Sequence, residues 1–301
     1  MDADIRRLSD AIIGEIFLAL GFSKTGWAFR AFGGLFRKAA DRLSTITVTA
    51  DRMIVTDGFA KAAAWMLTYF CELVTAQGKE TIPATGPLLI ISNHAGTYDT
   101  FVLASQVGRD DLKLIASDVP FLKNLPNAKM HCFFLSEQIQ DRMTAARAGI
   151  RHLKEGGALL LYGTGLIDPD PTVYPDAEKW IEKWLPSIDL FLRTLPETKV
   201  IISIVSGVVS KRWAHHPITW LKRIDWQKRR LAEFGQVLQQ LFRPGSFYLS
   251  PCVTFSPPLS VEKLTLESST RSLLPVVIAH GKALLAEHCK TFCRCVVHNK
   301  E

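Results

Sequence analysis

A histidine and an aspartate five positions apart follow directly after an apolar run. They are His94 and Asp99, and the run before them covers residues 87–91. An imidazole that donates its Nδ1 proton to a carboxylate keeps Nε2 free to take a proton from a hydroxyl near neutral pH. If the turn between them folds back, the segment predicts a general base. The alternative is a surface histidine and a helix-start aspartate that never meet, because long chains contain several such pairs.

The run at 88–91 predicts a buried strand that delivers His94 to the strand's carboxyl end. We expect Thr97 to cap a helix that runs through residues 100–104. Open α/β sheets hold their ligands at this edge. The location therefore favours a chemical role for the pair.

The remaining elements predict an α/β fold. Residues 1–80 show apolar positions at three- and four-residue intervals, with breaks expected at 21–26 and 44–47, which indicates an N-terminal helical module. In residues 81–301 short apolar runs alternate with amphipathic segments, which is typical of a mixed, largely parallel sheet flanked by helices. The expected strands are 88–91, 112–116, 132–135, 158–162, 200–205 and 250–255, with long helices at 141–154 and 177–195.

A second loop is expected at the edge that holds His94. Gly163, Thr164 and Gly165 follow the strand at 158–162. Glycines allow the backbone to turn sharply and to approach a ligand closely. We expect the amides of this loop to donate hydrogen bonds to an oxyanion or a phosphate. The alternative is a plain tight turn.

Composition and charge narrow the class of protein. The chain has 301 residues, 48% hydrophobic and 22% charged, which excludes extensive disorder. Its net charge of +7 favours anionic partners such as phosphates, anionic lipid or nucleic acid. The apolar segments at 11–20 and 62–70 are shorter than the roughly 20 residues that span a bilayer, so no transmembrane helix is expected. The acidic start lacks the basic region of a signal peptide, which favours a cytosolic location.

Soft metal ligands gather near the end of the chain. Residues 288–298 contain His288, Cys289, Cys293, Cys295 and His298. Zinc takes such ligands, but paired Cys-x-x-Cys knuckles are missing and the spacing matches no structural zinc pattern. We expect reduced thiols and no metal.

With both loops placed, the sequence resembles the glycerophospholipid acyltransferase family, which includes the lysophosphatidate acyltransferases. Residues 93–99 correspond to the family's Asn-His-x-x-x-x-Asp block, and residues 120–126 resemble the segment before its second block. Residues 153–165 resemble the block Leu-Lys-x-Gly-x-x-Leu-x-x-Phe-Pro-Glu-Gly in spacing, and the resemblance extends over roughly residues 81–210. It implies transfer of a fatty acyl group from a thioester, acyl-CoA or acyl-carrier protein, to a hydroxyl of a lysophospholipid, glycerol phosphate or other lipid-like acceptor, without a cofactor.

The resemblance also implies roles for individual residues. His94 would be the general base and Asp99 would stabilise the imidazolium, with no covalent enzyme intermediate. The chain contains no Gly-x-Ser-x-Gly elbow, which agrees with that mechanism. The expected substrate-binding residues are Asn93, Gly163, Thr164, Gly165 and Arg142.

The chain departs from the family's pattern in three places. Gly163 and Thr164 stand where the family has Pro-Glu, Ser136 where it has arginine, and Ser203 where it has proline. In the family this arginine and glutamate are associated with holding a phosphate-bearing acceptor, so the usual acceptor is in question. Two alternatives therefore stay open: a non-catalytic lipid-binding relative, and a hydrolase that uses the same dyad to activate water on thioesters.

A basic and aromatic stretch predicts contact with a membrane. Residues 211–230 contain seven Lys or Arg, three Trp and one acidic residue, Asp225. This pattern suits an interfacial helix on anionic lipid, and the alternative is a solvated helix with core tryptophans. Nucleic acid would use similar residues, but no nucleic-acid module accompanies them. We expect a cytoplasmic protein, peripheral on the inner face of the cell membrane, that docks through 211–230 and its N-terminal helices.

Overall fold

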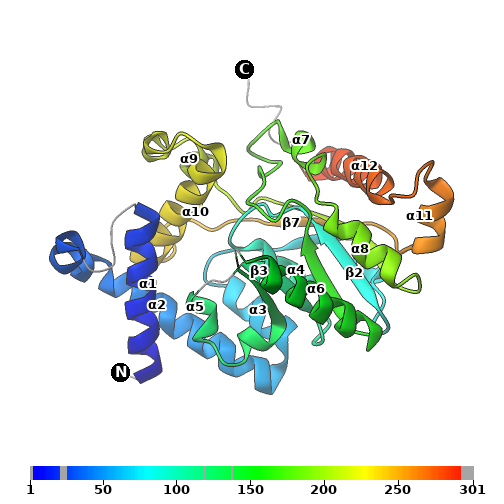
Figure 1. Cartoon of the computed structure of the whole chain (residues 1–301). Helices are drawn as coiled ribbons and strands as arrows, with labels where there is room; N and C mark the ends of the chain where they lie inside the picture. Colours follow the sequence, from blue (N-terminus) through cyan, green and yellow to red (C-terminus); the bar gives the residue numbers. More distant parts are fainter. Residues whose placement is uncertain (1–2, 21–25, 118–119, 137, 293–301) are drawn as a thin grey trace.

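The computed structural model describes residues 3–20, 26–117, 120–136 and 138–292. It confirms the α/β fold with a helical N-terminal region: an eight-stranded sheet has helices on both faces (Figure 1). The strand order is β1-β7-β6-β2-β5-β3-β4, and β8 pairs with β6. Strands β7 and β8 run antiparallel to β6, and the other pairs are parallel.

All six expected strands form, with ends that differ by at most two residues from those predicted. The strands are β1 Thr75–Gln77, β2 Leu88–Ser92, β3 Lys113–Ser117, β4 Cys132–Leu135, β5 Ala158–Tyr162, β6 Lys199–Ser206, β7 Cys252–Phe255 and β8 Leu259–Ser260. The sequence did not predict β1 and β8, because strands of three and two residues are too short to show a period.

The helices flank this sheet and precede it. They are α1 Ala3–Leu20, α2 Trp27–Asp57, α3 Phe59–Leu67, α4 Asp99–Val107, α5 Pro120–Lys123, α6 Ile139–Lys154, α7 Ala177–Ile181, α8 Ser187–Thr194, α9 Lys211–Ala214, α10 Asp225–Phe242, α11 Val261–Glu267 and α12 Leu274–Phe292. Short 3₁₀ turns are η1 Lys79–Thr81, η2 Ala128–His131 and η3 Pro217–Leu221.

Two helix predictions were wrong. The helix expected at 177–195 is two helices, α7 and α8, because Pro186 precedes α8 and cannot donate a helical hydrogen bond to the turn before it. No break occurs at 44–47. There the Thr45 and Thr47 hydroxyls donate to carbonyls four residues back, and α2 continues to a C-terminal Gly58 with φ of 89°. Of the break expected at 21–26, residues 21–25 lie outside the described part of the chain.

The central strand β2 is buried on both faces of the sheet. Leu88 and Ile90 belong to the hydrophobic cluster that includes α3 and α4, whereas Leu89 and Ile91 belong to the cluster that includes α8 and α12. A strand covered on both sides needs apolar residues at every position. This explains the unbroken apolar run in the sequence.

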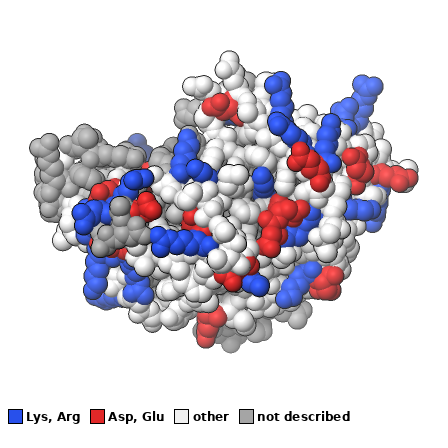
Figure 2. Space-filling model, turned by 90° about the horizontal axis from the view of Figure 1, so that it is seen from below, with Lys and Arg blue, Asp and Glu red and all other residues white. Residues whose placement is uncertain are grey.

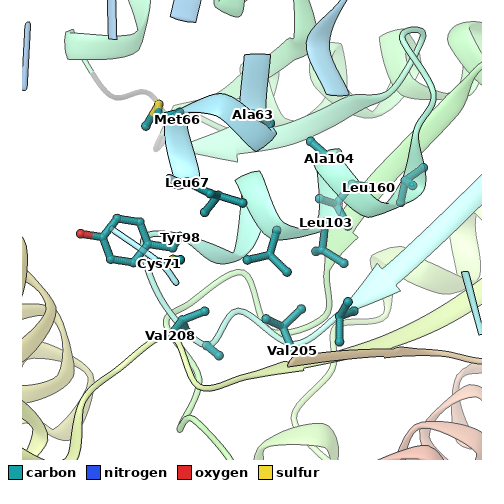
Figure 3. Packing of buried hydrophobic residues seen from close by; sticks show 14 of the residues in the cluster. Ala63, Met66, Leu67, Cys71, Tyr98, Leu103, Ala104, Leu160, Val205 and Val208 are labelled. Atoms are coloured by element: carbon teal, nitrogen blue, oxygen red, sulfur yellow. The ribbon is translucent and has the colours of Figure 1, made fainter. Parts of the chain in front are cut away.

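The N-terminal helices share the core of the sheet. In Figure 3, Ala63 and Leu67 of α3 lie over Leu103 of α4, with Val205 of β6 beyond them in the same cluster. Strand β1, which falls within the expected helical module, pairs with β7. The boundary expected at residue 80 therefore lies inside one packed unit.

We predict that Leu67→Ala lowers the free energy of unfolding of the whole chain by about 2–5 kcal/mol, because Leu67 is buried between α3 and the sheet domain. Val55→Ala, at an exposed position of α2, is the control and is expected to change it by less than about 0.5 kcal/mol. Chemical denaturation followed by circular dichroism and tryptophan fluorescence measures both. A main transition that Leu67→Ala leaves unmoved would mean that the N-terminal helices unfold separately.

Candidate active site

The turn after β2 brings His94 and Asp99 together. Nδ1 of His94 lies 2.8 Å from Oδ2 of Asp99. The Asp99 side chain is fully buried, whereas 26% of the His94 side chain is exposed. Because Nδ1 faces the carboxylate, Nε2 is the nitrogen that a substrate would meet. The turn thus folds back as the hypothesis of a general base requires.

Other groups hold the Asp99 carboxylate in place. The Gly96 amide donates to Oδ2 at 3.1 Å, and the Tyr162 hydroxyl donates to Oδ1 at 2.7 Å. The Tyr162 ring also stacks on His94, with 4.2 Å between ring centroids. A residue at the end of β5 therefore contacts both members of the pair. Sequence reasoning missed Tyr162, although it stands where the family's block has phenylalanine.

The loop after β5 holds the backbone of His94. The Asp168 carboxylate accepts the His94 amide proton at 2.9 Å, and the Asp168 amide donates to the His94 carbonyl at 2.6 Å. The buried Thr164 hydroxyl donates to Asp168 at 2.6 Å. Thr164, expected to bind substrate, thus orients the carboxylate that holds His94.

The glycines of this loop have structural roles. The Gly163 amide donates to the Ser92 carbonyl at 2.8 Å, and the Gly165 amide donates to the Tyr162 carbonyl at 3.1 Å. These two amides are therefore occupied, which argues against the expected oxyanion contacts. A Cβ at position 163 would lie 2.3 Å from Cδ1 of Trp184, so only glycine fits there.

Asn93 and Arg142 lie away from the exposed side of His94. The buried Asn93 side chain exchanges two hydrogen bonds with the backbone of Val205, at 2.9 and 2.8 Å, and ties the turn to β6. Arg142 is exposed in the first turn of α6, which follows β4, and strands β5 and β3 separate β4 from β2. The structure therefore gives Asn93 a supporting position and does not bring Arg142 to His94.

Glu233 of α10 is a residue of this region that the sequence did not indicate. Its carboxylate accepts the amide proton of Thr97 at 2.8 Å and the hydroxyl proton of Thr97 at 2.7 Å. Thr97 therefore does not cap α4, whose N-terminal cap position is Tyr98. No local signal points to Glu233, because it lies far downstream on a helix in which the basic residues 228–230 precede it.

Three carboxylates surround the imidazole and set its charge. Burial lowers the pKa of His94. The charge and hydrogen bond of Asp99 and the charges of Glu233 and Asp168 raise this pKa by more than burial lowers it, and the net result is a pKa of about 9. Burial raises the pKa of Asp168 to about 6 and that of Glu233 to about 7. The site thus stabilises an imidazolium, the form that a general base reaches after it takes a proton.

Within the described residues, no group of three His, Cys, Asp or Glu side chains is arranged to hold a metal ion. Cys293, Cys295 and His298 lie outside the described part of the chain. The prediction that residues 288–298 bind no metal therefore stays untested.

Comparison with known proteins shows what the segment around His94 resembles. Residues 73–175 match the family model named Acyltransferase, and the matched segment contains His94, Asp99 and the loop after β5. This confirms the predicted resemblance to the acyltransferases over these residues. A solved structure, the 1-acyl-sn-glycerophosphate (LPA) acyltransferase PlsC from Thermotoga maritima, is similar over 94% of this chain and 96% of that chain, with 16% identity and a TM-score of 0.47. A sequence search of curated proteins gave no match.

We predict that the His94 imidazole titrates with a midpoint near pH 9, well above the ordinary 6.5, because the protonated ring lies beside Asp99 and two further carboxylates. The Asp99→Asn variant removes the nearest charge and is expected to lower the midpoint. NMR titration of the histidine ring resonances, assigned with His94→Gln, measures both. A wild-type midpoint at or below 6.5 would contradict the prediction.

Proposed function

We propose that this acyltransferase moves a fatty acyl group from a thioester donor, acyl-CoA or acyl-carrier protein, to the hydroxyl of a lipid-like acceptor. The observation that supports this most is the 2.8 Å contact between Nδ1 of His94 and Asp99, with the ring partly exposed, inside the matched family segment. A dyad in this arrangement supplies a base to a hydroxyl without a serine or cysteine nucleophile.

In the proposed reaction, Nε2 of His94 takes the proton of the acceptor hydroxyl as its oxygen attacks the thioester carbonyl carbon. Only the neutral ring can take this proton, and because the pKa of His94 is raised to about 9, the neutral fraction increases as the pH rises toward that value. Asp99 stabilises the imidazolium that forms, and Tyr162 and Gly96 keep the carboxylate in place. The tetrahedral intermediate then collapses: the C–S bond breaks, the ester forms, and the leaving thiolate takes the proton from the imidazolium. His94 returns to its neutral form.

The acceptor proposed is a lysophospholipid, a glycerol phosphate or another lipid-like alcohol. The two positions associated in the family with a phosphate-bearing acceptor are engaged within this protein. Ser136 donates to Asp141, and Thr164 donates to Asp168. Neither side chain carries a positive charge, and both hydroxyl protons are donated within the protein instead of to a phosphate. Acceptors without a phosphate therefore have to be tested as well.

We predict that His94→Ala lowers kcat for acyl transfer by about 10²–10⁴-fold, the usual contribution of a general base. The assay offers acyl-CoA and acyl-carrier protein with lysophosphatidate, glycerol 3-phosphate, a lysophospholipid and a neutral monoacylglycerol, and detects ester products by mass spectrometry. Glu182→Gln, at an exposed position, is the control.

Other outcomes of this assay distinguish the alternatives. Undiminished transfer by His94→Ala would contradict the mechanism. Release of free fatty acid by the wild type without an acceptor would indicate a thioester hydrolase. Binding of lipid with neither reaction would indicate a non-catalytic relative.

We also propose that the enzyme docks on anionic lipid at the inner face of the cell membrane, through the middle of the basic stretch. Residues 211–230 do not form the single interfacial helix expected; they form α9, η3 and the start of α10. Trp213 is half-buried and donates to Gln239 at 2.7 Å. Trp220 and Leu221 are 76% and 75% exposed, and Ile224 is 52% exposed.

The docking loop, residues 220–224, thus combines exposed apolar side chains with Lys222 and Arg223. Apolar side chains that enter the headgroup region beside basic ones suit an anionic bilayer. Figure 2 shows another face, where basic and acidic side chains of the described residues are interleaved without a broad patch of one sign. The positive charge is thus not gathered on that face.

Several apolar side chains of α1 pack inward and are not available to lipid. Leu8, Ile12 and Ile16 of α1 are buried in a cluster that also includes α2. None of the helices among the described residues has the length and apolar character needed to cross a bilayer. The docking loop is therefore the contact that we put to the test.

We predict that the double variant Trp220→Ser, Leu221→Ser binds anionic vesicles at least about tenfold more weakly, because two exposed apolar side chains lose their burial in the headgroup region. Leu266→Ser is the control. Leu266 is 82% exposed but lies on α11, away from the docking loop with its Lys222 and Arg223. Sedimentation with phosphatidylglycerol-rich vesicles measures binding. Equal loss in both variants, or no loss, would contradict the assignment.

A further inference from the structure

Helix α10 presents a stripe of buried polar side chains to the site. Arg229, Glu233, Gln236 and Gln240 are all buried. Their spacing of four, three and four residues places them on one face of the helix. Such residue types are seldom buried unless they are paired, so their partners show what the helix holds.

The first two members of the stripe contact loops next to His94. Nε of Arg229 donates to the Ile167 carbonyl at 3.1 Å, in the loop after β5. Glu233 accepts two hydrogen bonds from Thr97, in the turn after β2. Both loops also supply direct contacts to His94, from Asp168 and from Asp99.

The other two members extend the same pattern. Gln236 accepts from the Ser210 amide at 2.7 Å and donates to the Val208 carbonyl at 2.9 Å, in the loop after β6. Gln240 accepts from the Tyr98 hydroxyl at 2.7 Å. One helix therefore contacts the loops that leave the carboxyl ends of β2, β5 and β6.

We infer that Glu233 is a positioning residue for His94, which fixes the catalytic turn on α10 through Thr97. The part of this inference that concerns catalytic activity rests on the proposed function. Helix α10 lies outside the segment matched by the family model, residues 73–175, so that match does not assign this role.

Packing and charge support the inference independently. A Cβ at Gly96 would lie 3.2 Å from Cδ of Glu233, so the helix touches the turn beside His94. Oε1 of Glu233 is buried and has no hydrogen-bond partner among the described residues. Burying this carboxylate therefore costs desolvation free energy, and the two hydrogen bonds from Thr97 to Oε2 offset only part of that cost.

The charged and titratable groups that influence Glu233 and its neighbours come from several elements. His94 and Asp99 act from the turn and α4, Asp168 and Tyr174 from the segment after β5, and Arg229 from α10 itself. The Glu233 charge raises the pKa of His94. A purely structural anchor would stabilise the fold without this electrostatic effect, which gives the test its discriminating readout.

The test compares Glu233→Gln with Glu233→Ala in the full chain. The Gln side chain keeps an oxygen that accepts from Thr97 but removes the charge, whereas Ala removes both. We expect Glu233→Gln to retain the backbone resonances of the turn and to lower the NMR titration midpoint of His94. We expect Glu233→Ala to shift those resonances and to lower kcat about 100-fold at unchanged KM, as a misplaced base does.

Glu182→Gln is the control that removes an exposed carboxylate and should change none of these quantities. An unchanged His94 midpoint in Glu233→Gln, or unperturbed resonances of the turn in Glu233→Ala, would overturn the inference. The NMR readouts do not need turnover. If the wild type transfers no acyl group, the proposed function fails while the titration and resonance data still decide whether Glu233 positions His94.

Discussion

The buried carboxylate of Asp99 is the group around which the site is arranged. A charge without access to water is tolerated only when donors surround it. Here His94, Gly96 and Tyr162 supply them from two different segments. The arrangement requires β2 and β5 to be neighbours, and they pair in parallel with Ser92 opposite Tyr162. The order of the central strands is therefore a precondition for the orientation of one imidazole.

The departures from the family's blocks change the residues around the His94 and Asp99 pair and leave the pair itself in place. With threonine in place of glutamate, the loop after β5 uses its 164 hydroxyl to orient Asp168, which holds both backbone groups of His94. With tyrosine in place of phenylalanine, the end of β5 gains a hydroxyl that donates to Asp99. Thr164, at one of the two positions associated with the acceptor, thus helps to fix the base. The geometry of the His94 and Asp99 pair is therefore kept, although these residues do not specify the identity of the acceptor.

The sequence was informative where structure is local. Strand β2 was predictable because burial on both faces demands an apolar run, and the approach of His94 to Asp99 needs one turn of chain. Glu233 was not predictable, because its partner Thr97 lies 136 residues away and basic residues precede it on an apparently solvated helix. The single helix expected at 211–230 failed for a related reason: charge pattern alone cannot show where Pro217 and the following turn interrupt the chain.

Helix α10 links the surface of the protein to its chemistry. The docking loop ends at residue 224, and Glu233 lies nine residues further, about 13.5 Å along the helix axis at 1.5 Å per residue. One rigid element therefore fixes the distance from the proposed membrane contact to the turn that carries His94. Anchoring the turn to α10, rather than to a flexible loop, keeps the base at a constant distance from residues 220–224.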